Sequence, residues 1–234
     1  MNNLDYEDYL KTLNKISWAI TSDLYLEDIL KLIVTLTANV MGAKICNVWL
    51  FNEKNKEFTI EATQAMSEEY LKKRTIKLTE GIVGLAAREK KPIIISDVLN
   101  DKRYKEKKLA KKEGLISMAS LPMMVKDKVI GVLNIYATSH YNFTKADLNL
   151  LSTIANQAAV AIEKTELIIK TKIIQEELDT RKKTERAKGI LMEERNINES
   201  EAFSLIRKSS MDKRISMKEI AEAIILSYEI RQIK

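Results

Sequence analysis

The chain has 234 residues, of which 45% are apolar and 31% charged, which is enough for one full hydrophobic core and a small second one. Its formal net charge of +6 is compatible with a polyanionic partner without requiring one. With one cysteine and one histidine, the chain can form neither an intramolecular disulfide nor a histidine-rich metal site. No apolar run reaches the roughly 20 residues of a membrane span, and no signal-peptide pattern is present. We therefore expect a cytoplasmic protein with no membrane partner.

The first 143 residues predict helices packed around an antiparallel sheet. Apolar residues recur at helical spacing over residues 4–21 and 26–41, so two helices open the chain. Runs rich in β-branched residues predict strands at 43–51, 58–63, 75–78, 93–95, 118–125 and 129–137. Helical patterns cover residues 80–88 and 102–113 between them. The fold class expected is therefore α+β, with five or six strands.

A very long helix is expected after this sheet. Thr144 and Asp147 fit a loose capping box, and no glycine or proline follows until Gly189. A helix from Thr144 to about Arg195 would be about 75 to 80 Å long. Its beginning, to about residue 165, is apolar enough to pack on the sheet, and residues 144–180 are expected to link two domains.

The middle of this helix carries a weak apolar seam. Ile162, Ile169 and Ile173 follow spacings of seven and four, after which the seam weakens and Leu178 lies out of register. We interpret these four residues as the contacts of a marginal parallel coiled coil in a homodimer. The alternative is a single helix that folds back on the first domain.

Residues 181–234 predict a three-helix bundle. Asn198 with Glu201, and Ser216 with Glu219, have the spacing of capping boxes and predict the starts of two short helices. Together with the end of the long helix, these helices can share a small core. Its expected members are Ala187, Ile190, Leu191, Ala202, Leu205, Ile206, Ile220 and Ile224.

The sequence offers no catalytic group of residues. Gly81 and Gly84 lack the remaining residues of a phosphate-binding loop, Cys46 on a predicted strand is expected to be buried, and Asp97 has no partner at a suitable spacing. We therefore do not expect an enzyme.

Several segments of the first domain form a recognisable set: residues 80–86, 92–98, 101–104, 120–123, 129–135, 143–151 and 155–159. Together, over residues 25–165, they resemble a GAF domain, a fold that senses small molecules and other signals. The Asn-Lys-x-Phe-Asp-Glu type of signature that accompanies cyclic-nucleotide binding is absent from the sequence, and Cys46 is not placed for attachment of a bilin. The resemblance implies a sensor whose small-molecule ligand or protein signal is unknown.

The stretch Glu185-Arg186-Ala187-Lys188-Gly189-Ile190-Leu191-Met192, with residues 198–208 and 220–224, is similar to an ANTAR domain. This resemblance covers about residues 181–230 and implies binding of paired RNA hairpins that overlap a terminator, so that transcription continues. Many members read Leu-Arg where this chain has Leu205-Ile206-Arg207, which leaves the position of that arginine uncertain by one residue.

Basic residues concentrate in the same segment. Residues 181–218 contain eleven lysines and arginines against six acids, most of the net charge of the chain. Arginine both neutralises phosphates and stacks on bases, while Phe203 and Tyr228 are either stacking platforms or core residues. The basic residues at 102–112 are interpreted as solvated surface. The residues expected to bind RNA are Lys182, Lys183, Arg186, Lys188, Arg207, Lys208 and Arg214.

Two other functions are compatible with this organisation. The first is a GAF-regulated DNA-binding transcription factor whose last two helices form a helix-turn-helix, although residues 211–215 lack a short glycine-containing turn. The second is a signalling enzyme with GAF input, for which the sequence carries no nucleotide-binding motif.

Overall fold

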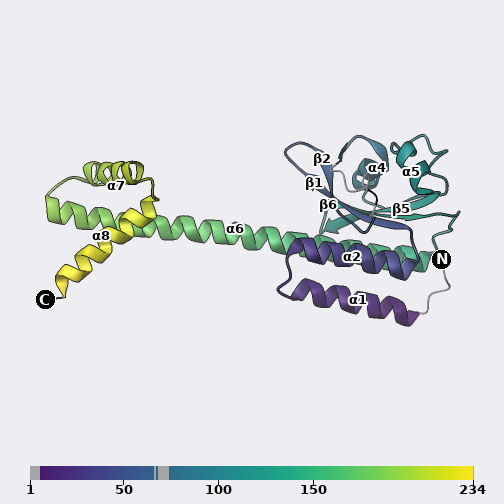
Figure 1. Ribbon diagram of the computed structural model, residues 1–234, viewed down its shortest axis with the longest axis horizontal. Coiled ribbons are helices and arrows are strands. Elements are labelled where there is room, and N and C mark those ends of the chain that lie inside the picture. Colours follow the sequence, from purple (N-terminus) through teal and green to yellow (C-terminus); the bar gives the residue numbers. More distant parts are fainter. Residues whose placement is uncertain (1–5, 66, 68–73, 234) are drawn as a thin grey trace. The chain divides into compact units, whose positions relative to one another are not determined.

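The computed structural model describes residues 6–65, 67 and 74–233 and confirms the α+β fold class. The chain divides into two compact units, Met1–Thr165 and Glu166–Lys234. One helix, α6 (Lys145–Arg195), contributes residues to both units (Figure 1). The domain boundaries expected at residues 143/144 and 180/181 stay predictions.

The first unit contains a six-stranded sheet in the order β3-β2-β1-β6-β5-β4, with every neighbouring pair antiparallel. Its strands are β1 (Ile45–Asn52), β2 (Glu57–Thr63), β3 (Thr75–Lys77), β4 (Ile93–Ile95), β5 (Ser117–Val125) and β6 (Lys128–Ala137). Its other helices are α1 (Tyr6–Thr21), α2 (Leu26–Met41), α4 (Gly81–Glu89) and α5 (Lys107–Glu113). The β-branched runs therefore predicted the strands to within about two residues at either end.

Helices cover both faces of the sheet. Helices α1, α2 and the beginning of α6 lie on one face, and α4 and α5 lie on the other (Figure 1). Because side chains alternate along a strand, Leu133 and Ile135 of β6 pack in the first layer while Val132 and Tyr136 pack in the second. The central strands are buried on both sides, which explains their nearly continuous apolar sequence.

Helix α5 is shorter than predicted, since it begins at Lys107 and not at residue 102. Aspartate side chains hold the preceding residues in turns. Asp97 accepts hydrogen bonds from the backbone N–H groups of Leu99 and Asn100, and Asp101 accepts one from the Arg103 N–H and pairs with its guanidinium at 2.6 Å. Such local bonds compete with the first turn of a helix, and a helical pattern of lysines does not reveal them.

The predicted capping box at the start of α6 is confirmed. The Thr144 N–H donates to an Asp147 carboxylate oxygen at 2.9 Å, and the Asp147 N–H donates to the Thr144 hydroxyl at 3.2 Å. The hydroxyls of Tyr9 and Tyr141 also donate to this buried carboxylate. Burial alone would raise the pKa of Asp147, but these hydrogen bonds outweigh burial and lower the pKa below its usual value.

Asp147→Asn is therefore expected to lower the unfolding free energy of the first unit by about 1 to 2 kcal/mol at pH 7, because charge-assisted hydrogen bonds are lost. A carboxyl whose pKa is lowered by folding stabilises above its unfolded pKa, about 3.9, and that contribution is lost as the pH falls through the folded value. When the free energy of unfolding is measured with denaturant from pH 2 to 7, it should therefore fall less steeply toward low pH in the variant than in the native chain. Asp127→Asn, at an exposed turn, is the matched control and should follow the native chain. The same pH dependence of the unfolding free energy in the native chain and both variants would contradict the prediction.

Within the described part of the chain, no helix is both long and apolar enough to cross a membrane.

Candidate functional site

The second unit is a bundle of three helices. The later turns of α6 pack with α7 (Glu199–Lys213) and α8 (Met217–Gln232). Both predicted capping boxes are confirmed: the Glu201 N–H donates to the Asn198 side chain at 3.0 Å, and the Glu219 N–H donates to the Ser216 hydroxyl at 3.2 Å. These caps fix where α7 and α8 begin and hence which side chains reach the surface.

The predicted core of this bundle is also confirmed. Leu205 and Ile224 are half-buried, and the other expected members are buried. A core of this size leaves much of each helix exposed, so the bundle has a large polar surface for its length.

Two cations of the predicted RNA-binding set connect α6 to α8. Lys183 Nζ lies 2.6 Å from a Glu222 carboxylate oxygen, and an Arg186 guanidinium nitrogen lies 2.7 Å from a Glu229 oxygen. Carboxylates therefore already neutralise both cations, which makes them weaker anion-binding groups than their sequence positions suggest.

Lys188 differs from its prediction more strongly. Only 8% of its side chain is exposed, and its ammonium lies 2.6 Å from Glu199 on α7 and 2.9 Å from Glu185 on α6. The Glu199 carboxylate and, less strongly, Glu185 hold the pKa of Lys188 above its usual value. Since it faces a neighbouring helix, Lys188 acts as an internal link of the bundle.

The remaining predicted cations are exposed. Lys182, Arg207, Lys208 and Arg214 have no ion pair with any described residue. The same is true of Lys213, which the RNA-binding prediction omitted although it lies in the same run of basic residues. We define the α7 basic cluster as Arg207, Lys208, Lys213 and Arg214. Asp212 is the acidic residue within this run, so the segment keeps a net positive charge.

Arg214 closes α7 in an unusual conformation. Its φ of 54° is left-handed, and its N–H donates to the Met211 carbonyl while the Ile215 N–H donates to the Ser210 carbonyl. Glycine is the usual residue at such a helix end. An arginine here places a cation at the exposed connection between α7 and α8.

Apolar side chains accompany this cluster on the surface of α7. Phe203 is 40% exposed and Met211 62%, and with Arg207 they follow a spacing of four along one face of the helix. Phe203 is therefore not a core residue, whereas Tyr228 is half-buried. An exposed ring one turn from an arginine is an arrangement on which an unpaired base can stack.

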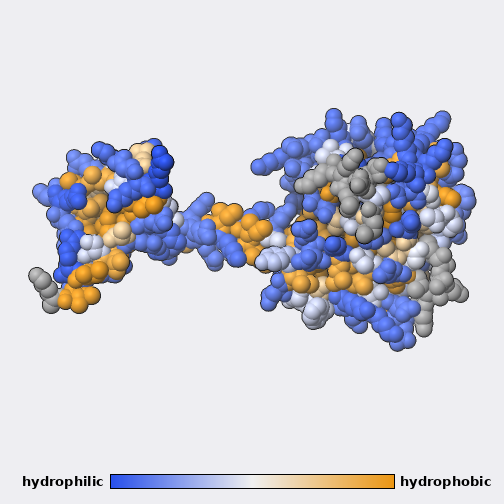
Figure 2. Space-filling view, in the orientation of Figure 1, coloured by the Kyte–Doolittle hydropathy of each residue, from blue (hydrophilic) through white to orange (hydrophobic). Residues whose placement is uncertain are grey.

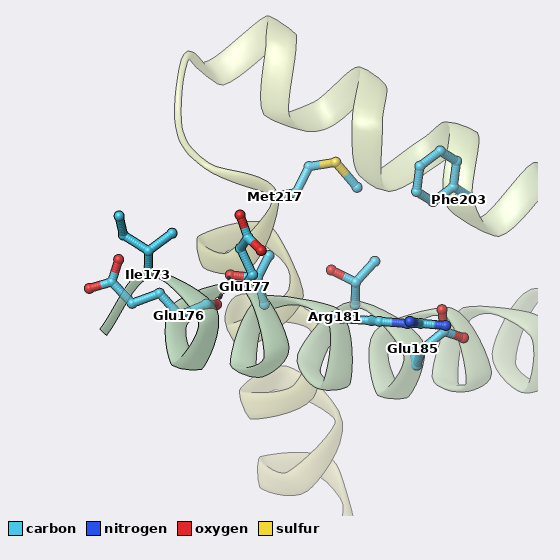
Figure 3. A pocket seen from close by; sticks show the side chains of 9 residues that line it. Ile173, Glu176, Glu177, Arg181, Glu185, Phe203 and Met217 are labelled. Carbon is cyan, nitrogen blue, oxygen red and sulfur yellow. Dashed lines mark hydrogen bonds between the residues drawn. The ribbon is translucent and has the colours of Figure 1, made fainter. Parts of the chain in front are cut away.

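A groove of about 520 Å³ opens beside this surface (Figure 3). Phe203 and Met217 line it from α7 and α8, and Arg181 with three glutamates of α6 lines the opposite wall. These glutamates are Glu176, Glu177 and Glu185. The excess of carboxylates disfavours phosphate groups in the groove, so an anionic partner is directed to the α7 basic cluster.

The structure separates the residues of the predicted coiled-coil seam. Ile162 is buried in the core of the first unit, so its expected part in an exposed seam is wrong. Ile169, Ile173 and Leu178 are 53%, 50% and 51% exposed. About half of each side chain is therefore left exposed by the described chain, and Leu178 lies on a different side of α6 from the two isoleucines.

The first unit holds a polar network inside the layer under α4 and α5. The Trp49 indole N–H donates to the Asn47 side chain at 2.8 Å, and the Ser120 hydroxyl donates to the Asn134 side chain at 2.7 Å. Asn47, Ser120 and Asn134 are fully buried, and Nδ2 of Asn47 has no hydrogen-bond partner among the described residues. A buried donor left over in this way can serve a polar small molecule.

The described residues do not suggest other chemistry. Cys46 is buried, as expected, and burial raises the pKa of its thiol, which disfavours the reactive thiolate. Within residues 6–65, 67 and 74–233, no group of three or more histidine, cysteine, aspartate or glutamate side chains is placed to hold a metal ion.

Comparisons with known proteins agree with this division. The family model of the GAF domain matches residues 24–163, and that of the ANTAR domain matches residues 173–225. Over 52 residues the chain is 42% identical to the transcriptional regulatory protein PdtaR of Mycobacterium tuberculosis, a match that covers 22% of this chain and 25% of that protein.

The first unit has relatives of its own. Over 158 residues, or 68% of the chain, it is 24% identical to a protein of Escherichia coli described as phosphoenolpyruvate-dependent phosphotransferase system, of which 21% is covered. The chain thus spans about a quarter or less of the length of these curated relatives. A solved GAF domain of a phosphoenolpyruvate-protein phosphotransferase from Coxiella burnetii has the same fold, with a TM-score of 0.64 and 23% identity over 69% of this chain and 96% of that one. The chain belongs to the GAF family, and it is an ANTAR-type regulator in which an ANTAR domain follows the GAF domain.

Proposed function

We propose that this protein is a signal-responsive regulator of transcription antitermination that binds RNA hairpins through its ANTAR domain, as a homodimer controlled by its GAF domain. One observation carries the proposal: the α7 basic cluster is exposed and has no ion pair with any described residue, while Lys183, Arg186 and Lys188 each pair with a carboxylate of α7 or α8. The contact surface is therefore centred on α7 and not on α6.

The chemistry of this surface suits a looped RNA. Lysine and arginine of the cluster neutralise backbone phosphates, and the exposed Phe203 ring with the Arg207 guanidinium offers two planar groups for unpaired bases. Sequence-specific RNA recognition depends on such unstacked bases, which hairpin loops display and a regular duplex does not.

The arrangement of α8 argues against the helix-turn-helix alternative. In that motif the second helix reads base edges from its N-terminal residues. Here the first turns of α8 carry Glu219 and Glu222, and Lys218 pairs with Asp179 at 2.7 Å. The first turns of α8 therefore offer no unpaired cation to the phosphates that border a DNA major groove.

The GAF domain supplies the signal in this proposal. A polar small molecule bonded to Asn47 would stabilise one state of the first unit, and a bias of a few kcal/mol is enough to change which state is populated. Dimerisation then matters because two linked RNA-binding surfaces raise the effective concentration of the second contact.

Competition binding tests the proposal. The full chain is mixed with a labelled hairpin RNA, and unlabelled hairpin RNA or duplex DNA of equal length is added at several salt concentrations. We expect the hairpin to compete at least tenfold better at each salt concentration, because loop contacts add to the phosphate contacts. Equal competition by the duplex would favour the DNA-binding alternative.

Arg214→Gly is expected to separate stability from binding. Glycine adopts the left-handed conformation without the strain that arginine carries, so the melting temperature of the second unit should stay the same or rise. Removal of the cation should weaken hairpin binding several-fold. Calorimetry and fluorescence anisotropy measure the two effects, with Lys108→Ala on α5 as the control for loss of an exposed charge. A fall in both the melting temperature of the second unit and the affinity for hairpin RNA would instead assign Arg214 a structural role.

A further inference from the structure

We propose that a pocket between α6, α7 and α8 takes up one unstacked base of the bound RNA loop, while Arg195 and Lys213 contact the phosphates beside that base. The inference rests on the proposed function and deepens it by naming a place at which the loop is read. We name this space the α7/α8 pocket. Its apolar walls are formed by Leu191, Leu205, Ile206, Ile220 and Ile224.

The size of the α7/α8 pocket suits one planar ring. Its volume is about 310 Å³, at the lower end of the roughly 300 to 1,000 Å³ of small-molecule sites. Small side chains leave this space open, since Ser209 lines it from α7, and Ala223 and Ser227 line it from successive turns of α8. A helix, which is about 10 Å wide with its side chains, is too large to enter.

The lining of the pocket matches the faces and the edge of a nucleobase. Its apolar walls can cover both faces of a ring, as apolar side chains do in proteins that bind an unstacked base. The polar edge of a base needs hydrogen-bond partners, and the Ser209 hydroxyl makes no hydrogen bond to a described residue. Leu205 and Ile224 are half-buried, and Figure 2 shows apolar surface among hydrophilic residues on the bundle. A bound ring would remove such surface from water.

Cations border the pocket. Arg195, Lys213 and Arg231 line it, against the single carboxylate of Glu194. Arg231 pairs with Glu194 at 3.0 Å, whereas Arg195 and Lys213 are exposed and have no ion pair with a described residue. An RNA base lies between two backbone phosphates. An apolar pocket with two unpaired cations at its border is therefore complementary to a nucleotide in charge as well as in size, which an apolar peptide side chain would not exploit.

Lys213 joins the pocket to the α7 basic cluster, of which it is a member. Leu205, Ser209 and Lys213 follow a spacing of four along the side of α7 that faces α8. Phe203 and Arg207 have the same spacing on the other side of α7. An RNA loop that covers α7 can thus place one base against Phe203 and another in the pocket. The groove beside Phe203 is lined by three glutamates and offers no second site of this kind.

Arg195→Gln tests the phosphate contact at the end of α6. Loss of this cation should weaken hairpin binding several-fold and make the slope of log K against log salt shallower by about 0.7, the value for one contact to a single strand. Lys108→Gln, which removes an exposed cation of α5, is the matched control and should leave the slope unchanged. Fluorescence anisotropy over a series of salt concentrations measures both variants. Equal slopes for the native chain and Arg195→Gln would contradict this contact.

Ala223→Leu tests the pocket itself. Ala223 is exposed on α8 and lines the pocket, so a leucine fills the space without removing a charge. Leucine is nearly as good a helix former as alanine and can pack on the apolar walls, so the melting temperature of the second unit should not fall. Ala223→Ser leaves the pocket open and is the matched control at the same position.

A hairpin RNA with single bases removed identifies what the pocket holds. A hairpin is selected on the native full chain from RNAs that share one stem and have a randomised loop, and each loop nucleotide is then replaced in turn by one that lacks its base. Removal of the base that enters the pocket should weaken binding to the native chain and to Ala223→Ser about tenfold. Ala223→Leu should bind the intact hairpin about tenfold more weakly, and removal of that same base should then have no further effect.

The loss of sensitivity at one loop position separates a filled pocket from a misfolded bundle, which would weaken binding of every RNA alike. The proposal is overturned if Ala223→Leu binds the intact hairpin like the native chain, or if it stays sensitive to every base that the native chain requires. In both cases the native chain still binds the hairpin, so the proposed function stands. If the native chain selects no hairpin at all, the proposed function fails together with this inference.

Discussion

Replacing Arg207 and Lys208 together by alanine is expected to lower the affinity for hairpin RNA about 100-fold. Both side chains are exposed, neither has an ion pair with a described residue, and each charge-assisted contact contributes about 1.5 kcal/mol. The slope of log K against log salt should also become shallower by about 1.4, because about 0.7 is lost for each phosphate contact to a single strand. Fluorescence anisotropy over a series of salt concentrations measures both effects.

The fold should survive this change, because alanine favours a helix and neither side chain packs in the core. The matched control is Lys183→Ala with Arg186→Ala, which removes two cations already neutralised by Glu222 and Glu229. This double variant should lower the melting temperature of the second unit, because two ion pairs between α6 and α8 are lost, and should change the affinity for hairpin RNA much less than the Arg207 and Lys208 double variant does. The RNA surface would lie on α6 instead if the Arg207 and Lys208 variant bound hairpin RNA as tightly as the native chain, or if the control variant lost more affinity for the hairpin than this variant does.

Gly131→Ala should destabilise the first unit by about 3 kcal/mol. Gly131 lies in the middle of the sheet, opposite Leu50 on β1 and Met123 on β5. A Cβ atom added there would overlap the carbonyl oxygen of Trp49 and lie 2.6 Å from the end of the Met123 side chain. The methionine can move, but the Trp49 carbonyl belongs to the central strand of a sheet buried on both faces, so its displacement disturbs the ladder.

Gly189→Ala is the control for this substitution. No atom lies within 4 Å of the position that its Cβ would take, and Gly189 is inside a helix, so alanine should stabilise the second unit by about 0.5 to 1 kcal/mol. Chemical denaturation of both variants measures the two changes. A Gly131→Ala variant as stable as the native chain would show that the sheet accommodates a side chain at this point.

The sequence predicted those features that depend on near neighbours. Capping boxes at Thr144, Asn198 and Ser216 join residues three positions apart, and strand alternation repeats every two residues, so both are visible without a fold. The start of α5 was misplaced because Asp97 and Asp101 form turns that a helical pattern of lysines conceals.

The functional surface was harder to predict because it depends on residues far apart in the chain. Lys183 meets Glu222 and Arg186 meets Glu229 only after α8 has folded against α6, and no short-range pattern shows that these cations are neutralised. The same holds for the dimer seam. Apolar periodicity places Ile162 in the same seam as Ile169 and Ile173, and only the folded sheet shows that Ile162 is buried in the first unit.

Photo-crosslinking tests the central claim most directly. A hairpin RNA with 4-thiouridine in its loop is bound to the native full chain and irradiated, and the attached peptides are identified by mass spectrometry. The account predicts that the crosslinks concentrate in α7 and its connection to α8, residues 199–214. Crosslinks confined to the basic residues at 102–112 of the GAF domain, or none from a hairpin that binds, would contradict it.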